Sequence, residues 1–591
     1  MNAGCSSAAS HDLTRSGALT TDVSTLRSPL RRRTVLAGGT AAGAGAAALV
    51  ASSTSAADAA GSRYFQHGVA SGDPMPERVV IWTRVTPTTD ATPGSGKGPK
   101  AQVSWEVATT RDFRSVLKRG TVATSASRDH TVKLDVAGLK PATWYFYRFR
   151  YRGTTSRVGR MRTAPAARST PGNLRFGVVS CSNLQAGWFT AYRGLAQRDD
   201  LHAVLHLGDY LYEYGPGQYG YGSDNIDIRK HEPRHEMVSL ADYRQRHAQY
   251  KRDADLQDLH AKYPWIITWD DHEVTNDQWR DGAENHTAGG GEDGEGSYVQ
   301  RRTRAHRAYD EWMPVRMDAT AALGDGARLY RRLTFGQLAE ISMLDLRTYR
   351  DEQVQTAAPT PVPALEAEVS DPDRTLLGRT QMRWLKESLS RQRAQWKIIG
   401  NPVMIAPVTF AAVPQDLLAP INDVTGLLPD DGLPYNVDQW DGYTDDRREV
   451  LTHIRDHQVK DALFVTGDIH SGWACELPFD VGADPVMGDS AGVEFVCSSV
   501  TSNNLKDITG TPPRTTSVAV EQVILANNQH IKYLNFDDHG FSVLDITAKR
   551  AQMDWFVIGD RADKQTTVRH TASFATRTGT GKVTSVDRPV R

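Results

Sequence analysis

The feature that most constrains the fold of this chain is a set of short, almost continuous apolar runs that begins at residue 174. The runs are LRFGVVS, HAVLHLG, PWIITW, LAEISMLD, WKIIGNPV and DALFVTG, and helical stretches such as LLGRTQMRWLKESLSRQRAQ separate them. A strand that is buried on both faces has this continuous apolar pattern. The alternation of such strands with helices predicts a layered α/β domain over residues 173–575.

An earlier segment, residues 63–165, follows a different pattern. RVVIWTRV, AQVSWEVAT, TVKLDVAGL and WYFYRFRY alternate apolar and polar residues, which is typical of half-buried antiparallel strands. LKPATWY places Leu139, Pro141, Thr143 and Tyr145 as in the tyrosine corner of immunoglobulin-like sandwiches. We therefore predict a small β-sandwich similar to a fibronectin type III domain. A chain of 591 residues has room for two such domains, and TAPAARSTPG is suited to link them.

The first 59 residues have the layout of an export signal. Arginines at 31–33 precede a short, weakly apolar Ala/Gly core, and small residues follow it. This core is too short and too rich in glycine to span a bilayer stably. RRTVL at 32–36 looks like a twin-arginine signal. We expect a signal peptide with its flanking N-region over residues 1–59, cleaved after Ala56 or Ala59. The export machinery is then a partner, and the mature protein is secreted, with the cell wall as a place where it can be retained.

Net charge indicates which partners the chain can bind, and cysteine content indicates which disulfides it can form. The formal net charge is −1 at pH 7, so neither nucleic acid nor an acidic membrane surface is indicated, and anion binding must come from a local site. Of four cysteines, Cys5 belongs to the leader, and Cys181, Cys475 and Cys497 are left, an odd number. One pair could form a disulfide, although we expect Cys475 and Cys497 to be buried core thiols.

Polar clusters follow four of the buried runs. They are SCS at 180–182, GDYLY at 208–212, WDDHEVTND at 269–277 and GDIHS at 467–471. One acid at a strand end is usually a cap or a turn residue, but four clusters on four strands are hard to explain in that way. Because ligands gather at strand ends in α/β layers, we expect the clusters to meet. Carboxylates suit Ca²⁺ or Mg²⁺, whereas thiolate and phenolate suit a ferric ion.

The motifs GDY…Y, WDDHE and GDIHS, in this order behind a β-sandwich and a twin-arginine leader, resemble the PhoD family of alkaline phosphatases. That family belongs to the calcineurin-like metallophosphoesterases, whose pattern is D-x-H, G-D, G-N-H-E and G-H-x-H. Here SC at 180–181 replaces D-x-H, DD at 270–271 replaces G-N, and Asp468 replaces the first histidine of the last motif. All three departures match PhoD, and the resemblance covers nearly all of the mature chain. It implies an α/β (α+β sandwich) metallophosphoesterase domain behind the immunoglobulin- or fibronectin-like β-sandwich.

The resemblance also implies a site that holds Fe³⁺ and Ca²⁺. The residues it assigns to iron are Cys181, Asp209, Tyr212 and His470, with Asp209 bridging the two metals. The residues it assigns to calcium are Asp271 and Asp468, with Asn276 as a weaker candidate.

Three further residues are expected to act on the substrate. His272 would stand near the substrate oxygen, where it stabilises charge or protonates the leaving group. Arg347 or Arg350, in DLRTYR, could grip a non-bridging phosphate oxygen, because guanidinium matches phosphate geometry. The alternative for either arginine is a structural ion pair.

The activity implied is that of a secreted alkaline phosphatase that hydrolyses phosphomonoesters and phosphodiesters. A metal-bound hydroxide or oxide would attack phosphorus in line, without a covalent phosphoenzyme. One alternative is a phospholipase D-like or wall-polymer phosphodiesterase, and another is a non-catalytic wall-binding protein. The metal-ligand set argues against the last, because structural metal sites rarely keep an open position. We expect a monomer with no integral membrane segment in the mature chain.

Other motifs are given structural interpretations. HEPRH at 231–235 matches a zinc-protease motif, but Pro233 opposes the helix that such a motif requires. DSA at 489–491 is interpreted as a turn, and GSGKGPK at 94–100 lacks the spacing and the Ser/Thr of a P-loop. Tyr210 and Tyr214 are assigned to packing, as are Trp265, Trp269, Trp279 and Trp312. Residues 576–591 are expected to form a polar C-terminal tail, and His539 could approach the site.

Overall fold

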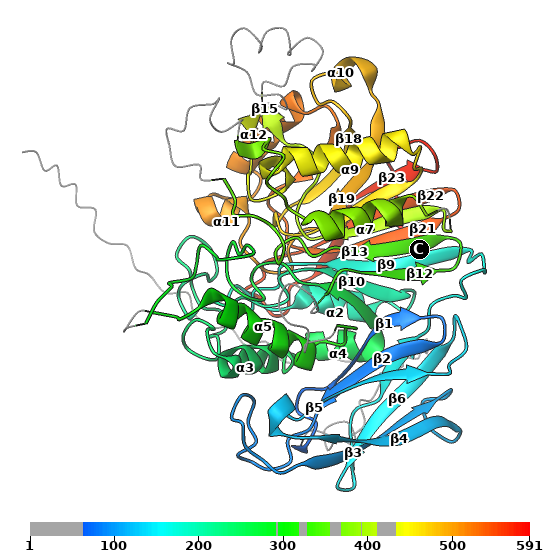
Figure 1. Ribbon diagram of the computed structural model, residues 1–591, viewed down its shortest axis with the longest axis vertical. Helices are drawn as coiled ribbons and strands as arrows, with labels where there is room; N and C mark the ends of the chain where they lie inside the picture. Colours follow the sequence, from blue (N-terminus) through cyan, green and yellow to red (C-terminus); the bar gives the residue numbers. More distant parts are fainter. Residues whose placement is uncertain are drawn as a thin grey trace, which may run out of the picture. The chain divides into compact units, whose positions relative to one another are not determined.

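Two β-sheets packed face to face form the centre of the structure, and helices cover their outer faces (Figure 1). This computed structural model describes residues 63–290, 294–317, 328–354, 368–391, 393–410 and 433–590. The expected leader and its two cleavage positions lie outside these residues. No helix within the described ranges combines the length and the apolar character that crossing a membrane requires.

The first sheet has ten strands in the order β24-β23-β22-β21-β9-β10-β11-β1-β2-β5. Its parallel centre consists of β9 (Asn173–Val179), β10 (Ala203–Leu207) and β11 (Pro264–Thr268), which are the first three apolar runs of the sequence. On one side follow the antiparallel strands β21 (Gly540–Thr547), β22 (Arg550–Ile558), β23 (Val568–Arg577) and β24 (Val583–Ser585). On the other side lie β1 (Val69–Met75), β2 (Arg78–Arg84) and β5 (Thr131–Ala137).

The second sheet has the order β12-β13-β14-β17-β19-β18-β20. Its strands are β12 (Arg331–Phe335), β13 (Ala339–Met343), β14 (Trp396–Asn401), β17 (Ala462–Thr466), β18 (Gly472–Pro478), β19 (Ser490–Val496) and β20 (Ile531–Asn535). Strands β13, β14, β17 and β19 are parallel. Between the two sheets lies a core that includes Phe176, Leu207, Ile341, Val465 and Phe495. Strands buried on both faces account for the near-continuous apolar runs.

The helices form the outer layers. Helices α2 (Thr190–Gln197), α3 (Leu240–Tyr250), α4 (Ala254–Lys262) and α5 (Tyr298–Trp312) pack against the first sheet. Helices α7 (Arg379–Leu389), α9 (Thr444–Asp456) and α12 (Thr516–Asn527) pack against the second sheet. The layers are therefore helix, sheet, sheet and helix, which confirms the expected α/β sandwich.

The predicted N-terminal β-sandwich is also confirmed. Strands β3 (Ala101–Ala108), β4 (Val116–Thr124), β6 (Trp144–Tyr151), β7 (Thr154–Thr155) and β8 (Gly159–Arg162) form one sheet, and β1, β2 and β5 face it across a shared core. The Tyr145 hydroxyl accepts a hydrogen bond from the Lys140 amide at 2.8 Å, which closes the expected tyrosine corner.

Two strand pairings go beyond the expectation. Strand β1 pairs in parallel with β11 through Ser71 and Gly72, so three strands of the sandwich extend the first sheet. Strand β24 pairs with β23, and the Val590 amide donates to Asp554 at 2.8 Å. The segment expected as a polar tail from residue 576 thus forms the edge of the first sheet. Edge strands carry polar residues on their exposed side, which is why this strand resembles a tail in the sequence.

Candidate metal centre

The four polar clusters meet at one edge of the two sheets. Cys181, Asp209 and Asp271 follow the ends of β9, β10 and β11, and Asp468 follows the end of β17 in the second sheet. Gly467 allows the two sheets to approach here, because a Cβ at this position would lie 2.7 Å from the Ser180 Cβ. The site is therefore built by strand ends from both sheets.

Four of the expected ligands have left-handed backbone conformations. The φ angles are 59° at Cys181, 55° at Asp209, 62° at Asp468 and 56° at His470. Each such angle costs a non-glycine residue about 1–3 kcal/mol, and strain of this kind concentrates at functional sites. The loops thus adopt unfavourable conformations that direct these side chains toward one another.

The residues assigned to iron lie together. Cys181, Asp209 and His470 each offer a ligand atom within 4.8 Å of the other two. The Tyr212 hydroxyl donates to Asp209 Oδ2 at 3.0 Å and lies 3.2 Å from His470 Nε2. His470 Nδ1 donates to the Asn503 carbonyl at 2.7 Å, which leaves the Nε2 lone pair directed at the cluster.

A carboxylate group adjoins them. Asp209, Asp270, Asp271 and Asp468 offer ligand atoms within 4.8 Å of one another, and Asp209, Asp271 and His272 form a further group of this kind. Asp209 is common to all three groups, as a bridging ligand would be. The Oδ1 atoms of Asp209 and Asp271 are buried and have no hydrogen-bond partner among the described residues. Buried carboxylate oxygens need a partner, and cations would supply it.

Burial and charge both act on this cluster. Burial raises the pKa of Asp209 well above its ordinary value, and the neighbouring Asp271 adds to the rise. Asp468 and His470 are only partly buried, so the cluster is open to solvent on their side. A closed structural metal site would not need this opening, whereas a catalytic site keeps a position for water or substrate.

His272 is fixed by Glu213, which no expected site motif includes as a functional residue. Its Nδ1 lies 2.8 Å from Glu213 Oε2, and its ring packs against that of Tyr212 with 4.1 Å between centroids and 35° between planes. Burial opposes the charge of His272, but Asp271, Glu213 and Asp209 outweigh it and raise its pKa well above the ordinary value. Glu213 stands in the motif LYEY, so an acid among tyrosines was the available signal.

Arg347 and Arg350 are both held by acids. Arg347 forms a two-pronged ion pair with Asp270, at 2.6 and 2.9 Å, and another with Asp438 at 2.8 Å. Its Nη2 also lies 3.5 Å from Asp468. Arg350 pairs with Asp438 at 2.7 Å. The structure thus shows the ion pairs that the sequence left open as an alternative, and a phosphate contact by either arginine stays a prediction. No motif marked Asp438.

Asn276 differs from the other candidates. Its backbone amide donates to Glu213 at 2.7 Å, and its side-chain amide donates to the exposed Glu284 at 2.7 Å. The side-chain nitrogen of Asn276 therefore binds a residue outside the carboxylate cluster. The role of Asn276 as a weaker calcium ligand stays a prediction.

Glu273 connects the strand ends. Its carboxylate accepts hydrogen bonds from the backbone amides of Asp209, Tyr210 and Asp270, at 3.1, 2.7 and 2.9 Å. The acid of the WDDHE motif is therefore a structural clamp between the loops after β10 and β11.

His539 lies next to the residues that support the centre. Its Nε2 is 2.9 Å from Asp507 and 2.6 Å from Arg561. Arg561 in turn contacts the side chain of Asn503, whose carbonyl holds His470. His539 thus reaches the site through two intervening residues.

The remaining motifs have structural roles. His231 and His235 lie outside any helix, which confirms that HEPRH is not a zinc-protease motif. Cys475 and Cys497 are buried free thiols, as expected. Tyr210 packs in the core and contacts His260, and Trp265, Trp269 and Trp312 are fully buried.

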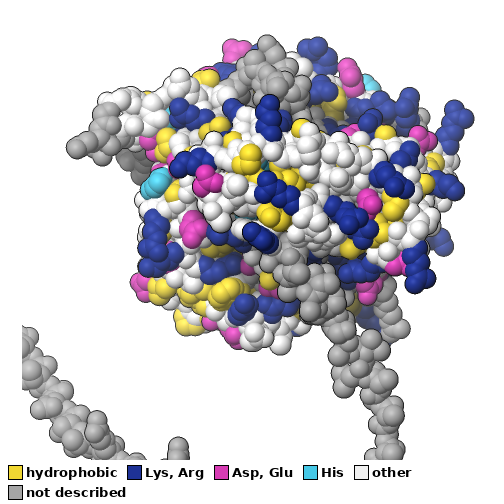
Figure 2. All heavy atoms as spheres, turned by 90° about the horizontal axis from the view of Figure 1, so that it is seen from below, with side chains coloured by type: hydrophobic (Ala, Val, Ile, Leu, Met, Phe, Trp, Pro, Cys, Tyr) yellow, Lys and Arg dark blue, Asp and Glu magenta, His cyan; other side chains and the backbone are white. Residues whose placement is uncertain are grey.

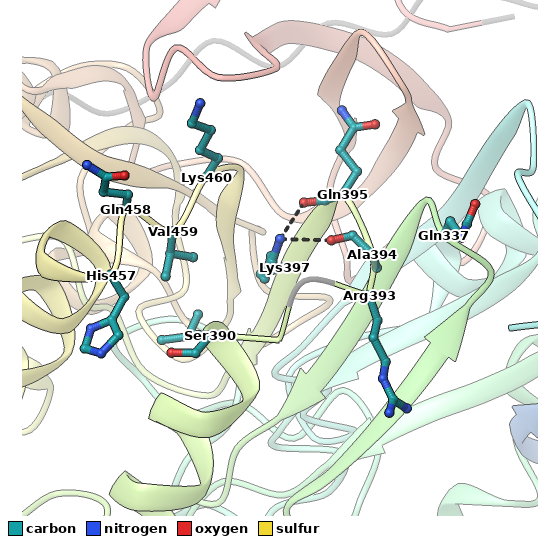
Figure 3. Close-up of a pocket in the computed structure, with 11 residues that line it drawn as sticks. Gln337, Ser390, Arg393, Ala394, Gln395, Lys397, His457, Gln458, Val459 and Lys460 are labelled. Atoms are coloured by element: carbon teal, nitrogen blue, oxygen red, sulfur yellow. Dashed lines mark hydrogen bonds between the residues drawn. The ribbon is translucent and has the colours of Figure 1, made fainter. Parts of the chain in front are cut away.

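A cavity of about 680 Å³ lies elsewhere, at the start of β14 (Figure 3). Arg393, Lys397, His457 and Lys460 line it together with neutral residues, and the amine of Lys397 donates to the carbonyls of Ala394 and Gln395. It contains neither a carboxylate nor any of the expected ligands. Its size makes it a possible ligand cavity, but its chemistry is not that of a metal site.

Comparisons with known proteins identify the family of this chain. Residues 176–555 match the PhoD-like phosphatase family, and residues 50–165 match the N-terminal domain of PhoD-like phosphatases. The chain belongs to the PhoD-like phosphatase family. It is therefore a phosphoric ester hydrolase.

Two relatives cover most of the chain. Alkaline phosphatase D of Bacillus subtilis (strain 168) is 35% identical over 535 residues, which are 90% of this chain and 84% of that protein. A solved structure described as the structure of PhoD is 33% identical, covers 89% of this chain and 93% of its own, and superposes with a TM-score of 0.76. Within this PhoD-like phosphatase, the match includes the β-sandwich as well as the domain that carries the metal centre.

Proposed function

We propose that this chain is a secreted, Fe³⁺- and Ca²⁺-dependent alkaline phosphatase that hydrolyses phosphomonoesters and phosphodiesters. The observation that carries the proposal is the pair of overlapping donor groups that share Asp209. One group has a thiol, an imidazole and a neighbouring phenol, and the other has only carboxylates. Thiolate, phenolate and imidazole together suit ferric iron, and hard carboxylates suit calcium.

The residues fit both ions. Cys181, Tyr212 and His470 would hold iron, Asp271 and Asp468 would hold calcium, and Asp209 would bridge them. The Oδ1 atoms of Asp209 and Asp271, which accept no hydrogen bond from the described residues, support this assignment, although Arg347 Nη2 lies 3.7 Å from Asp271 Oδ1. When bound, the two ions supply Lewis acidity and neutralise charge on the phosphoryl group.

The protein groups around the ions have separate tasks. His272, held at Nδ1 by Glu213, keeps its other ring nitrogen available to carry a proton toward the leaving-group oxygen. Arg347 holds Asp270 and Asp438 in place beside the calcium-side acids. Positioning is central in phosphoryl transfer, because ground-state and transition-state charge fall on the same oxygens.

The test of the metal assignment is elemental analysis of the purified protein together with its visible spectrum. We expect iron and calcium, and a visible absorption band from phenolate bound to ferric iron. Zinc in place of iron, with a colourless protein, would contradict the proposal.

The substrate class needs a second measurement. Rates with an aryl phosphate and with a bis-aryl phosphate separate a phosphomonoesterase from a phospholipase D-like or wall-polymer phosphodiesterase. We expect turnover of both esters at alkaline pH. A diester preference with negligible monoester turnover would reverse the order of the two hypotheses.

Export is part of the proposal. The RRTVL segment supports transfer by the twin-arginine machinery, and replacement of Arg32 and Arg33 by lysine should retain the enzyme in the cytoplasm. Fractionation of producing cells checks this. Unchanged secretion of the double variant would exclude the twin-arginine route. We further propose that the mature protein is a monomer.

A further inference from the structure

The near-zero net charge of the chain conceals two oppositely charged parts. Residues 63–165 contain 18 Lys and Arg against 7 Asp and Glu, whereas residues 166–591 contain 46 against 60. The β-sandwich is therefore strongly basic, and the catalytic domain is acidic. A charge of this size on a small domain creates a field that attracts anions.

Arginines gather on the outer face of one sheet of the sandwich. In β6, Tyr145, Tyr147 and Phe149 point into the core, so the alternate residues face outward. The outward arginines of β4, β6 and β8, which we call the arginine face, are Arg119, Arg148, Arg150, Arg160 and Arg162. Figure 2 views the molecule from the side on which Figure 1 shows β3 and β4, and Lys and Arg outnumber Asp and Glu there.

The strand register makes these arginines neighbours. Glu106 of β3 lies between Arg119 of β4 and Arg148 of β6. At the other edge, Phe146 and Trp144 of β6 pair with Arg160 and Arg162 of β8. The arginine face thus runs across four adjacent strands.

Acidic partners neutralise little of this face. Glu106 forms an ion pair with Arg148 at 2.7 Å. In the described part of the chain, no carboxylate lies within ion-pair distance of Arg119, Arg150, Arg160 or Arg162. Burial, and then repulsion by Arg160, lower the pKa of Arg162. Four of the five arginines of the face thus have no carboxylate partner among the described residues.

The chemistry of the face selects one kind of anion. Guanidinium groups match phosphate oxygens in geometry. Two of the aromatic rings nearby are already covered: Arg160 lies 4.1 Å from the centroid of Trp144, and Arg148 lies 4.0 Å from that of Phe113, whereas Phe146 of β6 is partly exposed. Trp144 and Phe113 are therefore not free to stack on nucleic-acid bases, which leaves the single ring of Phe146. Leu117 is the large apolar side chain exposed on these strands, which is too little to enter a membrane.

We infer that the arginine face binds a linear phosphodiester polymer through the charges of its backbone. The face is also well placed for this role. Arg160 donates to the carbonyl of Lys262, at the end of α4, and β11 begins just after it at Pro264. The metal ligands follow the opposite end of β11. A polymer held here leaves the metal centre free.

The test uses the full mature protein and a fluorescent abasic oligonucleotide, a phosphodiester chain without bases. Fluorescence anisotropy measures its binding, and gel electrophoresis confirms that the probe stays intact. The variant combines Arg119→Gln, Arg150→Gln and Arg162→Gln. At about fivefold per arginine, we expect binding about 100-fold weaker. The slope of log affinity against log salt should also fall by roughly 2–3.

A matched variant removes the same charge from the catalytic domain. It combines Arg383→Gln, Lys549→Gln and Arg588→Gln, all exposed and without an ion pair among the described residues. We expect a change in affinity below about threefold. The variant Arg119→Lys, Arg150→Lys and Arg162→Lys keeps the charge and should bind within about fivefold of the natural chain. All three variants should hydrolyse a small aryl phosphate at the natural rate.

Three outcomes would overturn the inference. Equal losses in the two glutamine variants would show that binding does not reside on the arginine face. Binding to oligothymidylate more than about tenfold tighter than to the abasic chain would indicate a nucleic acid as the partner. Binding to vesicles of phosphatidylglycerol, without binding to the abasic chain, would indicate a membrane.

Discussion

Tyr212 is the residue whose environment is most informative. Its hydroxyl contacts both Asp209 and His470, and it is fully buried. We expect Tyr212→Phe to lose the visible absorption band and to lower kcat/KM by at least about tenfold. Tyr210→Phe is the matched control, because Tyr210 is equally buried but contacts His260. A coloured, active Tyr212→Phe protein would remove Tyr212 from the ligand set.

Glu213 acts on the reaction through His272. Its replacement by glutamine removes the carboxylate that orients the His272 ring. Loss of a carboxylate that orients a site histidine typically lowers activity 10–100-fold. We expect Glu213→Gln to lower kcat by about that factor, to shift the pH–rate profile and to retain its metals. Glu232→Gln, at an exposed glutamate that pairs with Arg252, should leave kcat unchanged. Metal loss from Glu213→Gln would show a structural role instead.

At the scale of single residues, the sequence predicts the site where chemistry and position coincide. Four residues follow buried strands, and together they offer an unusual set of donor atoms: Cys181, Asp209, Tyr212 and His470. These residues lie close together in the structure. Asp438 could not be predicted in this way. It lies on a connecting segment, and only the fold brings it to Arg347.

Among the elements, the loops after β10 and β11 depend on one side chain. Glu273→Ala leaves three buried backbone amides without an acceptor, at about 1–3 kcal/mol for each buried donor. We expect the free energy of unfolding to fall by about 3 kcal/mol or more. Chemical denaturation monitored by circular dichroism measures this. Glu232→Ala, at an exposed glutamate whose side chain pairs with Arg252, should cost less, because that side chain accepts no backbone hydrogen bond among those described. Equal losses would show that Glu273 is no clamp.

The elements themselves are predicted well where their patterns are strong. Buried strands such as β10 and β17 are apolar throughout, and their type follows from that. Strand β24 could not be recognised, because a short, polar edge strand has the composition of a tail. Strand β24 is identified by its hydrogen bonds to β23, which the composition of its own residues does not indicate.

For the molecule as a whole, the bound metals should contribute to stability. Removal of cations leaves Asp209, Asp271 and their neighbours as adjacent buried acids. Ligands present at 100 times their dissociation constant stabilise a protein by about 2.7 kcal/mol. We expect chelation with EDTA to lower Tm by about 5 °C or more. Differential scanning calorimetry measures the shift, and restoration of Tm by iron and calcium is the control. An unchanged Tm in metal-free protein would contradict the ligand assignment.

The shared sheet should also make the two domains unfold together. Gly72 lies on β1, the strand that pairs with β11. A Cβ at this position would lie 2.1 Å from the Pro314 carbonyl oxygen. We therefore expect Gly72→Ala to lower Tm while preserving a single calorimetric transition. Gly172→Ala, at a bend with open space around it and no positive φ, separates this effect from that of losing a glycine. Two separate transitions in the natural protein would contradict the coupling.

The junction between β1 and β11 has a consequence for how such a protein can change over generations. Domains joined by a flexible linker can be exchanged by recombination, since each keeps its own sheet. Here the sandwich supplies the strand that covers one edge of the catalytic sheet. A recombinant that received a foreign sandwich would need a first strand able to pair with β11. The two domains are thus expected to be inherited as one unit.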